Sequence, residues 1–307
     1  MEAMNNSRPC PPLPSVNDAN EFIELQLDDR IRAIENEMSA DAISLNGPIL
    51  FGVDDLIRNA VEKKFHENPP RTKLVMLLTT GGGVVEVVPR IVDTLRRHYG
   101  VVDFIVPNYA FSAGTVLVMS GDAIHMDSYS RLGPIDPQII RGDGNQVPAL
   151  GYLERYNKLL HKANAGRAST AEIQLLISAF DQGELYQYDH ARELSITLLK
   201  QWLVKYKFKE WKITRTRKRK VTNRMRVREA ARIAKELNNT EKWHVHGHGI
   251  SMDVLEGDLN LRIDDFGMNP VRSKAIRGYH ELMCDYMGKR SNKAAIHFAG
   301  RYIPFMS

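Results

Sequence analysis

Short apolar runs alternate with longer amphipathic segments in the first half of the chain. The runs at 73–78, 101–106 and 123–126 have the length and composition of strands. The segment at 87–98 and the segment that begins at Ser112 have the period of helices. The strand segments are continuously apolar, as expected of strands that are buried on both faces. The pattern therefore predicts an α/β fold in which helices cover a parallel sheet.

The flanking segments extend this pattern on both sides. Residues 21–38 mix two periods and predict a short strand or helix entry followed by a helix, whereas 42–50 predict a strand that Asn46-Gly47-Pro48 interrupts. Residues 1–20 are rich in proline, asparagine and serine and predict a loose tail. Further helices are predicted at 53–65, 150–160, 170–178, 190–206, 228–237 and 270–287.

The cellular compartment of the protein is predicted from its apolar stretches, its cysteines and its first residues. The longest apolar stretches are far shorter than the roughly 18 residues that span a bilayer, and the N-terminus lacks the basic start and apolar core of a leader. The two cysteines, Cys10 and Cys284, do not form a disulfide framework and do not have the spacing of metal ligands. We therefore expect a cytoplasmic protein with two free thiols and no removed leader.

Positive charge is concentrated in one segment. Residues 205–232 hold thirteen Lys or Arg against two Glu, a net +11, so the formal charge of +5 leaves −6 for the remainder. Five of these cations fall within 215–220, with Phe208 and Trp211 close by. The segment at 207–228 predicts either a solvated loop between two helices or a binding site for nucleic acid or an acidic protein partner.

A glycine triplet and a serine follow two of the predicted strands. Gly81-Gly82-Gly83 comes after the strand at 73–78, and Ser112 comes after the strand at 101–106, at the start of a helix. A serine hydroxyl that attacks a carbonyl needs backbone N–H donors for the oxygen that becomes negative, and glycine lets the backbone approach closely. Together the two features predict a nucleophile and its oxyanion hole.

Each feature also has a plain structural explanation. The glycines fit a tight strand-to-helix turn, and the dinucleotide-binding fingerprint fails because Glu86 stands at the place of its third glycine. Ser112 fits a helix N-cap, a role that serine often fills. A nucleophile at a helix start is compatible with capping, so both interpretations of Ser112 stay open.

The order of strand, glycine loop, helix, strand, serine turn, helix and strand resembles the Clp protease and crotonase superfamily, which has a spiral of parallel β-strands. Thr79-Thr80-Gly81-Gly82-Gly83 stands where these proteases usually carry a Ser-Pro-Gly-Gly loop. Two segments resemble the serine dehydrogenase proteinase group, relatives of signal peptide peptidase A. They are Tyr109-Ala110-Phe111-Ser112-Ala113-Gly114-Thr115 and Arg131-Leu132-Gly133-Pro134-Ile135-Asp136-Pro137-Gln138. The resemblance covers residues 32–265.

The resemblance implies a role for each residue of the predicted site. Ser112 would be the nucleophile, at the positive N-terminal end of a helix. The oxyanion donors would be the N–H groups of Gly83 and Ala113, with Gly82 in the same loop. The proline of the usual loop is missing at Gly81, which implies a more mobile loop.

The resemblance also narrows the choice of proton acceptor. Clp-type enzymes use a histidine in the neighbourhood where this chain has Asp136, which disfavours a histidine triad. Enzymes like signal peptide peptidase use a lysine farther along, and the lysines in that window are Lys158 and Lys162. One of them is expected to be the base, with its pKa brought down from roughly 10.4 by burial. His161, beside Lys162, stays an alternative.

Other histidines are weaker candidates. His125 lies in a short strand whose alternation turns it toward the other face of the sheet. The run His244-Val245-His246-Gly247-His248 has metal-ligand spacing, but only Asp253 is close in sequence to complete a zinc site. Trp243, His246 and Gly247 also match a structural family element, Trp-x-x-His-Gly. We expect no metal and no organic cofactor.

Peptide hydrolysis by a serine peptidase is the expected function, in a homo-oligomer built as a ring or from trimers, as the resemblance implies. One alternative is an inactive oligomeric scaffold in which Ser112 is a helix cap and the basic segment binds nucleic acid or a protein partner. The other is the acyl-CoA chemistry of crotonases, which also use two backbone N–H groups. We expect a peptidase domain at 21–265, with a basic insertion at about 207–227, and a C-terminal helix and tail at 266–307.

Overall fold

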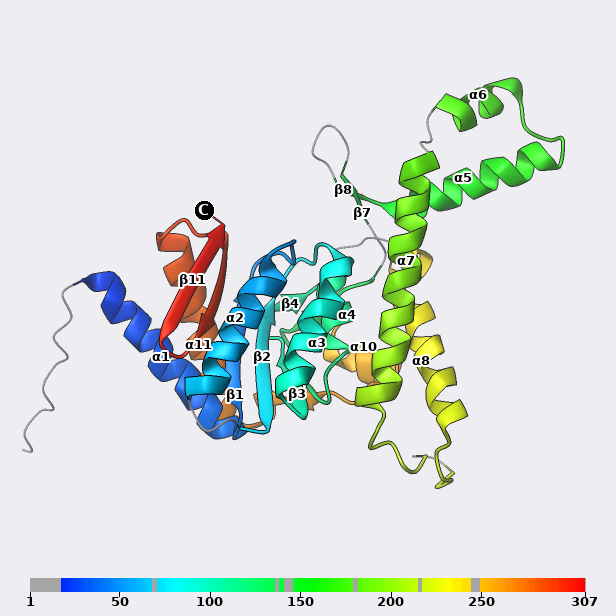
Figure 1. Ribbon diagram of the computed structural model, residues 1–307. Helices are drawn as coiled ribbons and strands as arrows, with labels where there is room; N and C mark the ends of the chain where they lie inside the picture. Colours follow the sequence, from blue (N-terminus) through cyan, green and yellow to red (C-terminus); the bar gives the residue numbers. More distant parts are fainter. Residues whose placement is uncertain are drawn as a thin grey trace, which may run out of the picture.

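A mostly parallel sheet forms the centre of the molecule in the computed structural model (Figure 1). The structure describes residues 18–67, 71–135, 138–140, 146–178, 182–214, 217–243 and 249–306. Within these ranges the main sheet has seven strands in the order β11-β10-β1-β2-β3-β5-β9. They are β1 (Asp41–Asn46), β2 (Lys73–Thr79), β3 (Val101–Ile105), β5 (Ile124–Met126), β9 (Asp264–Asp265), β10 (Ala294–Phe298) and β11 (Arg301–Met306).

The predicted parallel arrangement is confirmed for the central strands. β1, β2, β3, β5 and β9 run parallel to one another, while β10 pairs antiparallel with β1 and β11 pairs antiparallel with β10. Both faces of the sheet are buried: Leu74 and Met76 belong to one core cluster, and Val75 and Leu77 belong to the other. The apolar run in β2 follows from this double burial, because every side chain of the strand interior contacts core.

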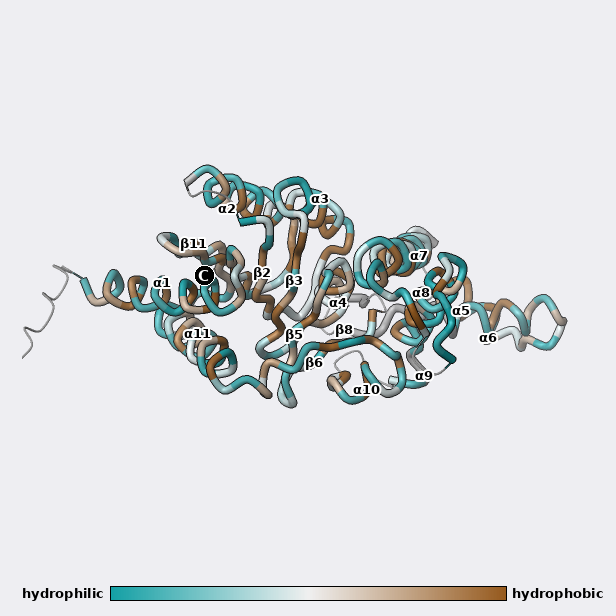
Figure 2. Tube along the Cα trace, turned by 90° about the horizontal axis from the view of Figure 1, so that it is seen from below, coloured by the Kyte–Doolittle hydropathy of each residue, from teal (hydrophilic) through white to brown (hydrophobic). Residues whose placement is uncertain are grey.

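Two pairs of helices cover the two faces. α2 (Val53–Glu67) and α3 (Val88–His98) pack together on one face, and α1 (Ala19–Met38) and α11 (Pro270–Lys289) pack together on the other. Figure 2, which looks along a different direction, shows the sheet between these pairs. The result is a three-layered α/β body with the sheet in the middle layer.

Capping residues explain where several helices begin. The side chains of Asp18, Thr222 and Asn269 each accept a hydrogen bond from a backbone N–H in the first turn of α1, α8 and α11. α1 is one continuous helix, so the expected separate entry at residue 21 is not present. Of the predicted loose tail, residues 1–17 lie outside the described residues. The remaining helices are α4 (Ala113–Val118), α5 (Ala149–Asn164), α6 (Thr170–Ser178), α7 (Gln182–Trp202), α8 (Asn223–Leu237), α9 (Thr240–Trp243) and α10 (Met252–Gly257).

The C-terminal residues complete the main sheet. No strand was predicted after residue 288, yet β10 pairs with β1 and β11 pairs with β10. β10 is fully buried, and its His297 lies 3.1 Å from Asp28 of α1 through Nε2 and Oδ1. α11 and β10 share a core with α1 and β1.

Two features extend from this body. α5 and α6 project away from it beyond one end of α7, and we call them the arm (Figure 1). At the other end of α7, residues 212–214 pair in antiparallel order with residues 217–221 through a bridge between Ile213 and Lys220, and we call these two paired segments the basic hairpin. No helix among the described residues combines the length and apolar character needed to cross a membrane.

Candidate active site

Ser112 lies on a strained turn between a short strand and a helix. The chain passes from β4 (Tyr109–Ala110) through Phe111 and Ser112 into α4. Ser112 has φ 53° and ψ −120°, a conformation that residues with a side chain rarely adopt. Such strain costs on the order of 1–3 kcal/mol and persists where the surrounding structure enforces it. It is the geometry of a nucleophile elbow, in which a sharp strand-to-helix turn presents a serine hydroxyl.

The structural alternative for Ser112, a helix cap, receives no support from its contacts. Ser112 occupies the N-cap position of α4, but its side chain makes no capping hydrogen bond. The residue is half-buried, and no described residue forms a hydrogen bond with its Oγ. The hydroxyl is therefore held beside the glycine loop without a structural role of its own.

The glycine loop presses against Ser112. A Cβ added at Gly82, where φ is 106°, would lie 2.7 Å from the Ser112 Cβ and 2.8 Å from the Phe111 carbonyl oxygen. A Cβ added at Gly83, where φ is 140°, would lie 2.1 Å from the Ile49 carbonyl oxygen. Only glycine fits at either position, because both the space and the backbone conformation exclude a side chain. The predicted proximity of the glycines and the serine is thus present in the fold.

Two backbone N–H groups near Ser112 are unengaged. Ile49 N–H donates to Gly82 O and Val84 N–H donates to Ile49 O, each at 2.8 Å, so one edge of the loop is fixed. The N–H of Gly83 points to the other edge, as the alternation along a parallel bridge requires, and finds no acceptor among the described residues. Ala113 is the first residue of α4, so its N–H has no acceptor within the helix.

Gly82 differs from Gly83 in this respect. Its N–H donates to Thr80 Oγ1 at 3.0 Å and is already engaged. Of the three predicted oxyanion residues, Gly83 and Ala113 therefore retain free donors, while Gly82 provides the close approach between the loop and the serine.

Thr80, which the sequence analysis did not single out, connects the loop to the serine turn. Thr80 N–H donates to Tyr109 O and Phe111 N–H donates to Thr80 O, both at 3.0 Å. The residue is buried, and its methyl group packs against Gly114 in the first turn of α4. The only sequence signal was its place directly before the glycines.

The Leu132-Gly133-Pro134 segment supports the serine turn from the opposite side. β6 (Arg131–Leu132) pairs in parallel with β4. Thr115 Oγ1 contacts both Ala110 O, at 2.7 Å, and Gly133 O, at 2.9 Å. A Cβ at Gly133 would lie 2.8 Å from the Phe111 ring. The two segments that carried the family resemblance are therefore neighbours in the fold, and each fixes the other.

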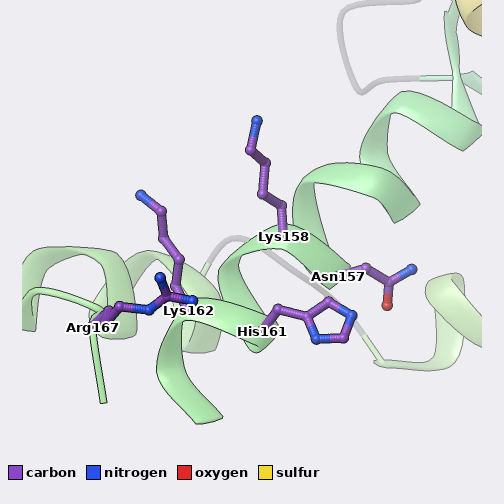
Figure 3. A pocket seen from close by; sticks show the side chains of 5 residues that line it. All are labelled: Asn157, Lys158, His161, Lys162 and Arg167. Carbon is purple, nitrogen blue, oxygen red and sulfur yellow. The ribbon is translucent and has the colours of Figure 1, made fainter. Parts of the chain in front are cut away.

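The lysine candidates lie on the arm rather than on the body that holds Ser112. Lys158, His161 and Lys162 are exposed residues of α5, and with Asn157 and Arg167 they line a shallow pocket (Figure 3). Lys162 Nζ donates to Glu172 Oε1 of α6 at 2.7 Å, and this contact lowers the pKa of Glu172 to about 2. No hydrogen bond joins any of the three candidates to Ser112 within the described residues.

His125 has a structural partner. Its Nε2 lies 3.3 Å from Asp103 Oδ2, which also accepts from Lys73 Nζ at 2.7 Å. Burial raises the pKa of Asp103, but the hydrogen bonds from His125 and Lys73 outweigh it and bring the pKa down to about 2. His125 is thus committed to a buried carboxylate in the middle of the sheet.

Lys207, the last residue of the π-helical segment (Leu203–Lys207) that follows α7, is a lysine whose pKa is lowered in the described region. Burial lowers its pKa to about 8, against the opposing charges of Asp264 and Asp103. It lies beside these sheet carboxylates, away from the serine turn. Asp136 and residues 244–248, which include the three spaced histidines, lie outside the described residues.

Solved structures of two proteases resemble the fold. One is a lysine-to-alanine mutant of the 1510-N membrane-bound stomatin-specific protease in complex with a substrate peptide, with 16% identity and a TM-score of 0.43 over 86% of this chain and 84% of that one. The other is the ClpP protease catalytic domain from Plasmodium falciparum, with 14% identity and a TM-score of 0.31 over 39% of this chain and 63% of that one.

Sequence comparison adds two uncharacterized proteins of Methanocaldococcus jannaschii. One is 33% identical over 88 residues, 29% of this chain and 28% of the relative. The other is 38% identical over 71 residues, 23% of this chain and 25% of the relative. The matched segments thus span about a quarter of each relative's length.

The family profile covers the part of the chain that holds the serine turn. A profile described as ClpP-like SDH-type serine proteinase matches residues 54–210, about half of the sequence. This range contains the glycine loop, Ser112 and both lysine candidates. The chain belongs to the ClpP-like SDH-type serine proteinase family.

Proposed function

We propose that the protein hydrolyses peptide bonds through an acyl-enzyme on Ser112. The Oγ attacks the peptide carbonyl, the oxygen that becomes negative accepts from the N–H groups of Gly83 and Ala113, and the leaving amine takes up a proton. Water then attacks the acyl-enzyme and releases Ser112. The substrates are peptides or proteins, as family membership implies.

The conformation of Ser112 is the observation that carries this proposal. Ser112 has a positive φ but makes no capping hydrogen bond that would offset the strain. The conformation places its Oγ beside a loop that only glycine can form. Strain of this kind is retained at functional sites when it preorganises a reacting group. An inactive scaffold would need neither the strain nor the two free N–H groups.

A serine-reactive fluorophosphonate probe tests the nucleophile. The wild-type protein is expected to be labelled, and Ser112→Ala is expected to lose labelling and peptide hydrolysis together, by three orders of magnitude or more. Ser128→Ala, at an exposed serine outside the turn, is the matched control and retains both. Equal labelling of the wild type and Ser112→Ala would exclude the acyl-enzyme.

We further propose that a lysine of α5, either Lys158 or Lys162, accepts the Ser112 proton. Both reach to the same side of the arm in Figure 3. A lysine base needs a dry environment, because burial favours its neutral form. Both candidates are exposed in the single chain, so the proposal requires that a second copy of the chain, or the substrate, cover the arm.

Substitution of the two lysines distinguishes them. Replacing the true base by alanine is expected to reduce kcat by about 10²- to 10⁴-fold, with loss of the alkaline-dependent rise in the pH–rate profile. The alanine variant of the other lysine and Arg167→Ala, whose residues line the same pocket, are the controls. Each is expected to change kcat by only a few-fold. Unchanged kinetics in both lysine variants would rule out a base on α5.

A further inference from the structure

The two segments of the basic hairpin are joined by backbone hydrogen bonds, in contrast to the solvated loop that was one expectation for this part of the chain. Val221 N–H donates to Lys212 O and Thr214 N–H donates to Arg219 O, each at 2.8 Å. The family profile ends at residue 210, directly before the hairpin. The hairpin therefore presents its charges from a fixed scaffold and lies outside the part that matches the family.

The base of the hairpin is attached to the sheet. The Arg226 guanidinium donates to Lys209 O at 3.1 Å and to Trp211 O at 3.0 Å. Lys209 forms an ion pair with Asp122, whose Oδ2 accepts from Val102 N–H at 2.8 Å. Val102 and Asp122 stand at the amino ends of β3 and β5, so the hairpin is anchored at the edge of the sheet opposite to the one that carries the glycine loop and Ser112.

The tip of the hairpin carries uncompensated positive charge. Four consecutive cations are exposed, and within the described residues none of them forms an ion pair. They are Arg217, Lys218, Arg219 and Lys220. Lys212, lower on the hairpin, is paired with Glu210 at 2.8 Å, so the free charge is confined to the tip. A surface with this charge binds phosphate groups.

The apolar side chains nearby indicate which phosphate-bearing partner fits. The rings of this segment are occupied: Phe208 and Trp211 pack against the core, and the Arg96 guanidinium covers Tyr206 at 3.7 Å. Stacking on nucleobases needs exposed rings, and none of these three is available. Ile213, in contrast, is 60% exposed and faces Lys220 across the hairpin. An aliphatic side chain among cations suits a bilayer interface, where it enters between the headgroups.

We propose that the basic hairpin docks the protein on an anionic phospholipid surface. Residues 217–220 contact the headgroup phosphates, and Ile213 enters the interfacial layer. Because the hairpin and the Ser112 turn lie at opposite edges of the sheet, docking leaves the catalytic edge directed away from the lipid. Figure 1 shows the hairpin and the arm at opposite ends of α7, so the arm also stays free.

Vesicle flotation of the full-length protein tests the proposal. Vesicles of phosphatidylcholine with added phosphatidylserine are expected to bind the protein, whereas vesicles of phosphatidylcholine alone are not, and high salt is expected to weaken the binding. Each cation contributes about five-fold in affinity, so replacing the four residues 217–220 together by serine is expected to reduce partitioning by about 600-fold. Ile213→Ser is expected to reduce it by about ten-fold at unchanged charge.

A second set of variants controls for net charge and folding. Four exposed cations elsewhere, replaced together by serine, lose the same charge and are expected to bind vesicles within a few-fold of wild type; they are Arg32, Arg58, Arg262 and Lys289. Thermal unfolding and fluorophosphonate labelling should be unchanged in both sets. Equal binding to the two vesicle types, or equal loss in both sets, would overturn the proposal. The proposal would also be overturned if the protein bound RNA more tightly than vesicles and if Ile213→Ser had no effect on binding. That result would assign the hairpin to nucleic-acid binding.

Discussion

At the scale of the residue, the candidate site depends on the backbone conformation of single positions. Gly82→Ala places a Cβ 2.7 Å from the Ser112 Cβ, at a φ of 106°. We expect peptidase activity to fall by about 100- to 1000-fold, because the oxyanion donors and the serine are displaced. The unfolding free energy should fall by about 1–3 kcal/mol. Gly81→Ala is the matched control, since a Cβ at Gly81 meets nothing within 4 Å. Steady-state kinetics and urea unfolding measure both effects, and equal activity in the two variants would contradict the assigned geometry.

At the scale of the element, Asp103 joins three strands, because it lies on β3 and binds Lys73 of β2 and His125 of β5. Its pKa of about 2 in the folded state lies below that of the unfolded chain. Its stabilising contribution is therefore complete above about pH 4 and is lost as the pH falls toward about 2. Relative to Asp103→Asn, the wild type should lose about 2 kcal/mol of unfolding free energy over this range. Urea unfolding at a series of pH values measures the difference, with the exposed Asp285→Asn as control. Parallel pH profiles for wild type and Asp103→Asn would show that Asp103 is not the group that titrates.

At the scale of the whole molecule, the arm is the surface most suited to contact between copies. Its α6 has no buried residue among those described and exposes Ile173, Leu175 and Ile177, the last at 76%. Ile173 and Ile177 lie on one side of the helix and Leu175 on the other, and exposed apolar side chains of this kind mark an interaction site. We expect sedimentation velocity to show a homo-oligomer for the wild type. The double variant Ile173→Asp and Ile177→Asp is expected to dissociate this oligomer. Peptidase activity should fall to the same extent if a neighbouring copy buries the lysine base. Ile213→Asp, on the distant hairpin, should leave the oligomer intact. A wild-type protein that is monomeric and fully active would exclude this arrangement.

Local sequence patterns predicted most of the elements near the site. The strands at β2, β3 and β5 and the helices α2, α3 and α6 lie within two residues of their expected bounds, because their apolar periods are set by neighbouring residues. β10 and β11 were missed, since their pairing depends on β1, which is far away in the sequence. The pairing of residues 212–214 with residues 217–221 was missed because a run of cations gives no strand period.

The α/β class, the family and the pairing of a glycine loop with Ser112 were all predictable from the sequence, because each is encoded in short segments of characteristic residues. The conformation of Ser112, the different hydrogen bonding of the Gly82 and Gly83 N–H groups, and the position of the lysines on an exposed arm became apparent only in the folded structure. These depend on contacts between distant segments, such as Ile49 with Gly83 and Thr80 with Phe111. The physical reason is that a backbone is forced into a strained conformation, and an N–H is left free, only when several strands converge on one point.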